Sequence, residues 1–131
     1  LMSQSTILVE ARGKWYIHAD PIRLRQVFWN LLTNSSQAMP FGGNILVGVE
    51  STRRDGQDFI RASVRDEGEG IPEDVQAKIF DPFFTTKEDG TGLGLATSYR
   101  IIEEHCGTLE LESQVGKGST FSVYLPQHEG A

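Results

Sequence analysis

The stretch Asp89-Gly90-Thr91-Gly92-Leu93-Gly94-Leu95-Ala96 is the most informative part of the sequence, and it follows closely on Phe83-Phe84-Thr85-Thr86-Lys87. Three glycines within five residues let the backbone approach a ligand, because glycine tolerates positive φ and has no Cβ. From Leu95 to Cys106 apolar residues then recur at helical spacing. A glycine-rich loop before a helix offers free N–H groups to an anion. The stretch fits either a phosphate-binding loop, with Lys87 and Thr91 beside it, or a surface loop that caps a helix.

Two familiar nucleotide-binding loops do not match. A P-loop needs Gly, four residues and then Gly-Lys-Ser or Gly-Lys-Thr, and the sequence contains no such string. A dinucleotide-binding fingerprint follows a strand, whereas the segment from Pro82 to Lys87 is a poor strand candidate. The rest of the chain must therefore decide what the glycine stretch does.

The bulk composition bounds the class of protein. The chain has 131 residues, 38% of them hydrophobic, a formal net charge of −6 and a single cysteine, Cys106. We expect one domain over residues 1–131. We expect it to be soluble, because no apolar run approaches the roughly 20 residues of a membrane span, and cytoplasmic, because a lone cysteine suggests a reducing compartment. The negative charge argues against a nucleic-acid partner, and the lone cysteine excludes an internal disulfide. We also expect the sequence to be an excised piece of a longer protein.

A long amphipathic helix is predicted from Ile22 to Met39. Asp20 is expected to cap it and Pro21 to occupy its first turn. Three amides at a spacing of four residues form one polar stripe along this helix, namely Gln26, Asn30 and Asn34. Because asparagine is a mediocre helix former, the stripe fits either a solvated face or a set of ligand-binding groups.

A hairpin is predicted from two strands, Ile45 to Thr52 and Phe59 to Asp66, with turn residues between them. Strand alternation places Asp66 on the same face as the apolar residues of the second strand. A carboxylate on a buried face needs a hydrogen-bond donor, because an unpaired buried charge is costly. Either the N–H groups of the following turn, which contains Gly68 and Gly70, or a ligand can supply that donor.

The remaining elements complete a two-layer α+β sandwich, in which one mixed, mostly antiparallel sheet carries helices on a single face. The expected strands are Thr6 to Glu10, Lys14 to His18, and two at the C-terminal end around Leu109–Leu111 and Phe121–Leu125; the expected helices are Pro72 to Ile79 and Thr97 to Cys106, the latter ended by Gly107. We interpret the Gly116 to Thr120 stretch as a hairpin turn, since it leads into a strand.

Taken together, these motifs resemble the catalytic, ATP-binding domain of bacterial sensor histidine kinases, a member of the Bergerat-fold (GHKL, HATPase_c) superfamily. The resemblance runs from about Lys14 to Pro126. Its boxes are Asp20 to Asn34 (N box), Asp66 to Gly70 (first glycine box), Phe80 to Phe84 (F box), Gly90 to Gly94 (second glycine box) and the closing Gly118 to Phe121. Each box alone is weak, and their common order and spacing make the match specific.

The resemblance implies a role for each matched residue. Asp66 would accept a hydrogen bond from the adenine amino group. Asn34 would coordinate Mg²⁺ through its side-chain oxygen, and Asn30 would face the phosphates or the water shell of the ion. Lys87 would join these two asparagines as a catalytic group, within an ATP lid at about residues 81–95. The other nucleotide-binding residues would be Gly68, Gly70, Ile71, Phe83, Phe84, Thr86, Gly90, Thr91, Gly92, Leu93, Gly94, Leu95 and Thr120.

The implied reaction is transfer of the ATP γ-phosphate to a histidine on a separate dimerisation helix, and from there to a response regulator. None of the histidines present (His18, His105 and His128) lies in an acceptor context. We therefore expect the dimerisation and sensor domains to lie outside this sequence. Alone, the domain would bind ATP and Mg²⁺ but hardly turn ATP over.

Three other functions remain open. Self-contained ATPases of this fold place a glutamate as the water-activating base where this chain has Asn30, and an amide is no general base at neutral pH. Anti-sigma serine kinases generally have a less complete F box than Phe80 to Phe84. A non-catalytic nucleotide-binding module would bind nucleotide without transferring phosphate to a supplied acceptor domain.

Overall fold

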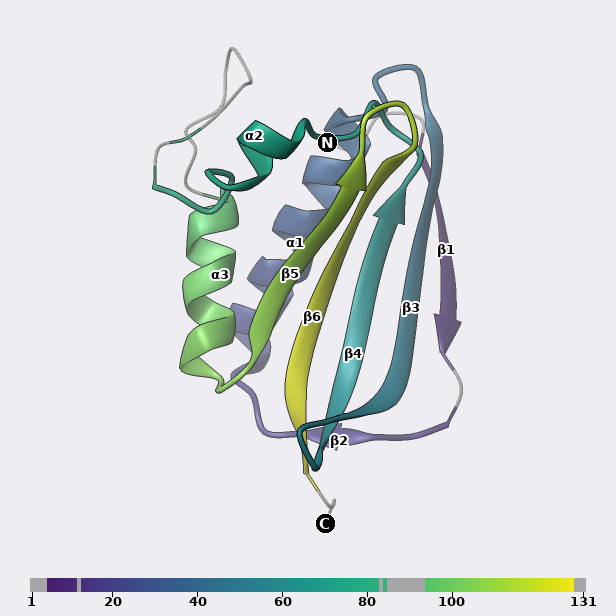
Figure 1. The fold of residues 1–131 in the computed structure, drawn as a ribbon. Helices are drawn as coiled ribbons and strands as arrows, with labels where there is room; N and C mark the ends of the chain where they lie inside the picture. The colour runs from purple at the N-terminus through teal and green to yellow at the C-terminus, as the bar shows by residue number, and fades with distance from the viewer. Residues whose placement is uncertain (1–4, 12, 83, 85–93, 129–131) are drawn as a thin grey trace.

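The computed structural model describes residues 5–11, 13–82, 84 and 94–128. In chain order the elements are β1 (Ser5–Ala11), β2 (Tyr16–Ile17), α1 (Pro21–Gln37), β3 (Gly43–Arg54), β4 (Gln57–Asp66), α2 (Glu73–Gln76), α3 (Gly94–Glu104), β5 (Thr108–Gln114) and β6 (Gly118–His128). The helices lie on one face of a curved sheet, with α1 and α3 beside each other (Figure 1). The predicted α+β sandwich is confirmed. Most of the lid predicted at 81–95 lies outside the described residues.

The sheet is mixed and mostly antiparallel, as predicted. Its order is β1-β3-β4-β6, with β5 also on β6 and β2 against the far end of β6. Only the β1–β3 pair is parallel among the described pairs. The first two strands do not pair with each other, because β1 adds to β3 while Tyr16 pairs with His128 of β6. The chain between them therefore crosses from one part of the sheet to another.

Helix α1 begins where the sequence predicts. The Asp20 Oδ1 atom accepts hydrogen bonds from the N–H groups of Ile22 at 3.0 Å and Arg23 at 3.4 Å, and Pro21 occupies the first turn, where its missing N–H is not needed. The side chains of Val27 and Leu31 are fully buried against the sheet. The amphipathic face thus fixes how α1 lies on the sheet and where its polar stripe points.

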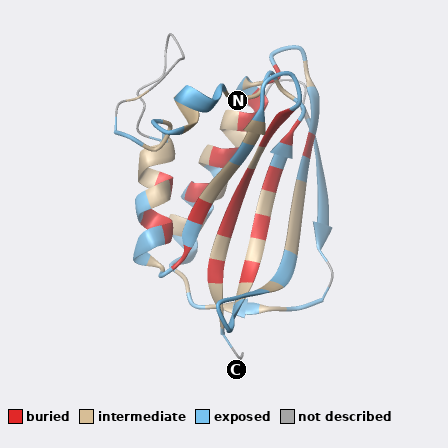
Figure 2. Cartoon of the chain, viewed as in Figure 1, coloured by how far each residue is buried: buried red, intermediate tan, exposed pale blue. Residues whose placement is uncertain are grey.

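The β3–β4 hairpin sets which side chains of β4 are covered. Its two central turn residues, Asp55 and Gly56, have φ values of 52° and 77°, as a two-residue hairpin turn with matched twist requires. With this register, Val64 and Asp66 fall on the face under the helices and are buried, whereas Arg65 is exposed. Figure 2 shows the resulting alternation of buried and less buried residues along the central strands.

Helix α3 differs from the prediction at both ends. It begins at Gly94 rather than Thr97. At its end, the Gly107 N–H donates to the carbonyl of Ile102 at 2.9 Å, and Cys106 has a φ of 62°, which is the geometry of a Schellman motif. Gly107 follows because a Cβ there would lie 2.1 Å from the carbonyl oxygen of Tyr124. The left-handed position usually held by glycine is thus held by an exposed cysteine.

Candidate functional site

The carboxylate of Asp66 ends β4 and is only 1% exposed. Its Oδ1 atom accepts hydrogen bonds from the N–H of Gly68 at 2.9 Å and from the N–H of Ser119 at 3.3 Å. Its Oδ2 atom is also buried and has no hydrogen-bond partner among the described residues. Since an unpaired buried acceptor is costly, Oδ2 is suited to accept a hydrogen bond from a ligand. One oxygen of Asp66 is therefore held by the fold, and the other has no partner among the described residues.

The turn after Asp66 is pressed against two neighbouring segments. A Cβ on Gly68 would lie 2.7 Å from the carbonyl oxygen of Ala38, at the end of α1. A Cβ on Gly70, whose φ is 79°, would lie 2.3 Å from the carbonyl oxygen of Gln114 at the end of β5. Both glycines are required by close backbone contact, so the turn holds Asp66 between α1 and the β5–β6 hairpin.

The asparagine stripe of α1 connects to the start of α3. The Asn30 side-chain nitrogen donates to the carbonyl of Gly94 and to the hydroxyl of Ser98, both at 3.2 Å. The Ser98 hydroxyl also donates to the Gly94 carbonyl, at 2.9 Å. Asn34 lies one turn further along α1, towards Ala38 and the Gly68 turn. The stripe therefore spans the distance between the Asp66 turn and the first turn of α3.

The other predicted nucleotide-binding residues divide into two groups. Ile71 and Leu95 are half-buried against the core, and the N–H of the half-buried Phe84 donates to the carbonyl of Asp81 at 3.2 Å. Apart from Thr120, the remaining ones lie outside the described residues, namely Phe83, Thr86, Lys87, Gly90, Thr91, Gly92 and Leu93. Their predicted roles stay predictions.

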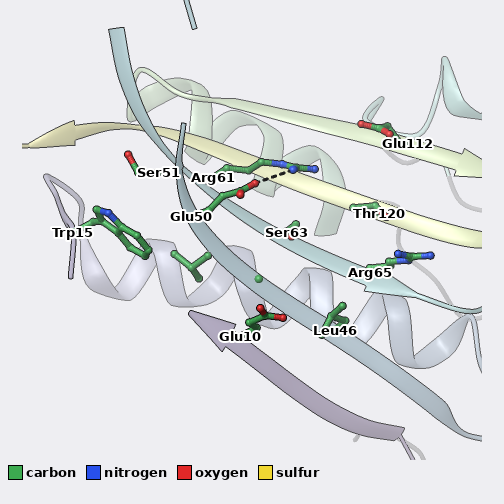
Figure 3. A pocket seen from close by; sticks show the side chains of 12 residues that line it. Glu10, Trp15, Leu46, Glu50, Ser51, Arg61, Ser63, Arg65, Glu112 and Thr120 are labelled. Carbon is green, nitrogen blue, oxygen red and sulfur yellow. Dashed lines mark hydrogen bonds and ion pairs between the residues drawn. The ribbon is translucent and has the colours of Figure 1, made fainter. Parts of the chain in front are cut away.

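Thr120 does not lie with Asp66. Thr120 pairs with Arg65 and lines a pocket of about 710 Å³ on the open face of the sheet, away from the helices (Figure 3). Ser119 pairs with Asp66 instead, is 5% exposed and donates its N–H to Asp66 Oδ1. The alternation that buries Phe121 also buries Ser119, so strand periodicity could have identified Ser119 from the sequence.

The open-face pocket is a mixed polar surface. Arg61 reaches Glu50 at 3.1 Å across it, and Trp15 and Leu46 lie towards β1 (Figure 3). Among the described residues that line it, Thr120 is the one predicted to belong to the site. The pocket thus lies on the opposite side of the sheet from the Asp66 turn.

Among the described residues, two surface pairs shift the pKa of one of their members. Hydrogen bonding to Arg23 of α1 lowers the pKa of the exposed Glu104 on α3, and hydrogen bonding to Glu110 raises the pKa of Arg54. His105 adds a second link between the two helices, because its Nε2 atom accepts the N–H of Asp20 at 3.0 Å. The Arg23–Glu104 and Asp20–His105 contacts hold α1 against α3 at the end remote from Asn30.

The donor set of the site suits a hard metal ion with many water ligands. In the part of the chain that the structure describes, no three His, Cys, Asp or Glu side chains gather as a metal cluster. Asn34, half-buried on α1, offers an amide oxygen, and Mg²⁺ in nucleotide sites takes one or two protein oxygens together with waters and phosphates.

None of the helices within the described residues has the length and apolar character needed to cross a bilayer.

Comparisons with known proteins agree on one family. Residues 19–129 match the family described as histidine kinase-, DNA gyrase B-, and HSP90-like ATPase. The chain is 47% identical to sporulation kinase E of Bacillus subtilis over 115 residues, which are 88% of this chain and 15% of that protein. It is 48% identical to the sensor histidine kinase ZraS of Escherichia coli over 110 residues, which are 84% of this chain and 23% of ZraS.

Solved structures give the same answer. The catalytic domain of the histidine kinase ThkA superposes with a TM-score of 0.82 at 35% identity, over 95% of this chain and 80% of that one. Full-length ShkA in complex with AMPPNP superposes with a TM-score of 0.82 at 31% identity, over 97% of this chain and 26% of that one. The chain therefore spans a minor part of its full-length relatives and most of an isolated catalytic domain.

Proposed function

Because this chain belongs to the family of histidine kinase-, DNA gyrase B- and HSP90-like ATPases, and within it to the histidine kinase catalytic domains, we propose that it binds Mg²⁺-ATP and donates the γ-phosphate to a histidine. That histidine would lie on a separate dimerisation domain of a longer sensor kinase. From there the phosphate would pass to a response regulator.

The observation that carries the proposal is the buried Oδ2 atom of Asp66, which has no hydrogen-bond partner among the described residues. A buried acceptor of fixed orientation is what selects a base with an exocyclic amino group. Gly68 and Gly70 hold this turn close to Ala38 and Gln114, because a Cβ on either glycine would overlap a carbonyl oxygen there. Adenine would therefore lie against this turn, with its amino group donating to Asp66 Oδ2.

The phosphates would extend from the Asp66 turn towards α1 and the start of α3. Asn34 would supply the protein oxygen for Mg²⁺, which neutralises phosphate charge when bound. The side-chain nitrogen of Asn30 already donates to Gly94 and Ser98, so its oxygen is the atom left for the phosphates or the ion's waters. Lys87 and the second glycine box would complete this side.

Phosphotransfer is favoured over hydrolysis by the same helix. Asn30 stands where an ATPase of this fold would need a water-activating carboxylate, and its amide hydrogens are engaged by α3. An amide cannot take a proton from water at neutral pH. The chain's contribution would thus be to position ATP for attack by a histidine.

The test is calorimetric titration with Mg²⁺-ATP of the wild type, Asp66→Asn and Asp58→Asn. Asp58 lies on the same strand but is exposed and paired with Arg53, so it controls for the change of charge. We expect binding by the wild type and the Asp58 variant, and at least a tenfold loss in the Asp66 variant, since a buried hydrogen bond to the ligand is lost.

Binding must then be linked to transfer. Addition of the parent protein's histidine-containing domain and γ-labelled ATP should give a labelled histidine on that domain. Equal ATP binding by wild type and Asp66→Asn would overturn the placement of adenine. Binding without any label transfer would instead support the non-catalytic module.

A further inference from the structure

The hydroxyl of Ser113, near the end of β5, joins three separate segments. It accepts the N–H of Ile71 at 2.8 Å, it lies 2.9 Å from the carbonyl oxygen of Gly118, and it lies 2.8 Å from the hydroxyl of Ser119. Ile71 ends the glycine turn, whereas Gly118 and Ser119 begin β6. Ser113 was not among the residues predicted to form the site.

Counting protons fixes the direction of these bonds. A serine hydroxyl has one proton and two lone pairs. Because the Gly118 carbonyl can only accept, Ser113 must give its proton to Gly118 and receive those of Ile71 and Ser119. The hydroxyl of Ser113 is then saturated, and any substitution that removes it leaves two donors and one acceptor without their partner.

The side chain of Gln76, on α2, also joins the glycine turn to β5. Its side-chain nitrogen donates to the carbonyl of Ile71 at 2.8 Å and to the carbonyl of Ser113 at 3.1 Å. Both backbone groups of Ile71 are therefore held, its N–H by Ser113 and its carbonyl by Gln76. A third bond, from the N–H of Gly116 to the carbonyl of Glu69 at 2.8 Å, ties the turn to the β5–β6 hairpin.

This network leads to the carboxylate of Asp66. The two N–H groups that hold Asp66 Oδ1 belong to Gly68 and Ser119. Gly68 lies in the turn that Ser113 anchors at Ile71, and Ser119 bonds to Ser113 directly. A carboxylate is planar, so two fixed bonds to Oδ1 also set the direction of Oδ2, the atom without a partner among the described residues.

We propose that Ser113, assisted by Gln76, is a positioning residue that aims the free oxygen of Asp66 and thereby sets the preference for a purine with a 6-amino group. The inference rests on the proposed function, because it assumes that the base lies at Asp66. Ser113 acts only through the turn and through Ser119. It determines which base is accepted rather than whether a nucleotide is held.

The experiment compares the affinity for ATP with that for inosine triphosphate, which carries a carbonyl in place of the 6-amino group. Ser113→Ala should lower the ratio of the two affinities by roughly tenfold, as expected when one ligand hydrogen bond is lost. The ITP affinity itself should change little. A merely structural role would weaken both nucleotides alike and leave their ratio unchanged.

Two matched variants separate the causes. Ser122→Ala removes a buried hydroxyl of the same sheet that accepts from Arg61 on the open face, and it should leave the ratio at the wild-type value. Ser113→Thr keeps the hydroxyl and should restore most of the preference. Thermal unfolding of each variant reports whether it is folded. If Ser113→Ala does not fold, Gln76→Met takes its place, and this variant should lower the ratio of ATP to ITP affinity less strongly than Ser113→Ala would.

The outcomes also separate this inference from the proposed function. A wild type that binds ATP and ITP equally would overturn the placement of the base at Asp66. A wild type that prefers ATP, with Ser113→Ala and Gln76→Met showing the same preference, would overturn the role of Ser113 alone.

Discussion

The two sides of the candidate site are held together by different means. At the Asp66 turn, backbone lies against backbone, because a Cβ on Gly118 would lie 2.1 Å from the carbonyl oxygen of Asp66. Between α1 and α3 the contacts come from side chains, with Asn30 at one end and the exposed pair of Arg23 and Glu104 at the other. One side is a junction of main chains that the side chains of Ser113 and Gln76 cross-link, and the other is a contact between helix surfaces.

This difference in contacts predicts how well each side of the site tolerates substitutions. Backbone groups in contact cannot move apart without breaking the sheet, whereas a surface side chain can adopt another rotamer at small cost. A fixed junction suits selection of a rigid base, and a contact of side chains suits the part of the site that must admit phosphates. Substitutions at the junction should therefore have the larger effects.

The largest effect is expected for Gly118→Ala. Its φ is 101°, and the added Cβ would overlap the backbone of Asp66, so the free energy of unfolding should fall by roughly 3 kcal/mol. Gly116→Ala is the control, because its φ of 83° is similar but nothing lies within 4 Å of its Cβ position. That variant should lose only about 1 kcal/mol. Urea unfolding measures both, and equal losses would contradict the junction.

The next effect tests the helix contact. Asn30→Asp keeps the shape but replaces two donated hydrogen bonds with an acceptor facing the Gly94 carbonyl, and it should lower the free energy of unfolding by about 2 kcal/mol. The exposed Gln26, one turn earlier on the same stripe, supplies the control Gln26→Glu, which should change stability by no more than about 0.5 kcal/mol. A neutral Asn30→Asp would mean that the contact contributes nothing.

A gain in stability is expected at Ser35. The Ser35 side chain is fully buried, and its hydroxyl has no partner among the described residues. Ser35→Ala should therefore raise the free energy of unfolding by about 1 kcal/mol. Ser98→Ala is the matched comparison, because that buried hydroxyl bonds to Gly94 and Asn30 and its loss should destabilise. Destabilisation by both would refute this reading of Ser35.

The smallest effect concerns the exposed pair of Arg23 and Glu104. Arg23 lowers the pKa of Glu104 in the folded protein, so the pair's contribution is present above the ordinary glutamate pKa and is lost as the pH falls through the lowered value. The stability difference between wild type and Arg23→Ala should thus shrink on acidification below about pH 4.3. In a Glu104→Gln background, the loss of stability caused by Arg23→Ala should not depend on pH. If the loss keeps the pH dependence that it has in the wild-type background, the Arg23–Glu104 pair is not the source of that dependence.

Much of the fold followed from local rules. The cap at Asp20, the Asp55-Gly56 turn and the buried side of β4 all depend on residues close in sequence, and each was predicted. The partners of β1 and β2 were not, because a period of two indicates a strand but carries no information about its neighbour. The start of α3 at Gly94 was missed because glycine disfavours helix. The Gly94 carbonyl accepts hydrogen bonds from the side chains of Asn30, which lies far away in the sequence, and of Ser98, and these contacts form only in the folded protein.

The arrangement of the candidate site was predictable in part for the same reason. The burial of Asp66 and the turn at Gly68 and Gly70 could be predicted because alternation and turn chemistry are read along the chain, while the binding roles of these residues stay predictions. Ser113 and Gln76 could not, because their role depends on three segments that meet only in the folded protein. Ser119 could have been found by extending the alternation of β6 two residues back from Phe121.

The crossing of the chain between β1 and β2 also bears on how the protein folds. The β3–β4 hairpin joins residues that are close in sequence, so it can form early. Tyr16, by contrast, pairs with His128, and this contact must wait until the whole intervening chain has been synthesised and ordered. Within this domain, β2 is thus made well before its native partner and is among the last strands to pair, which makes it a natural marker for the final step of folding.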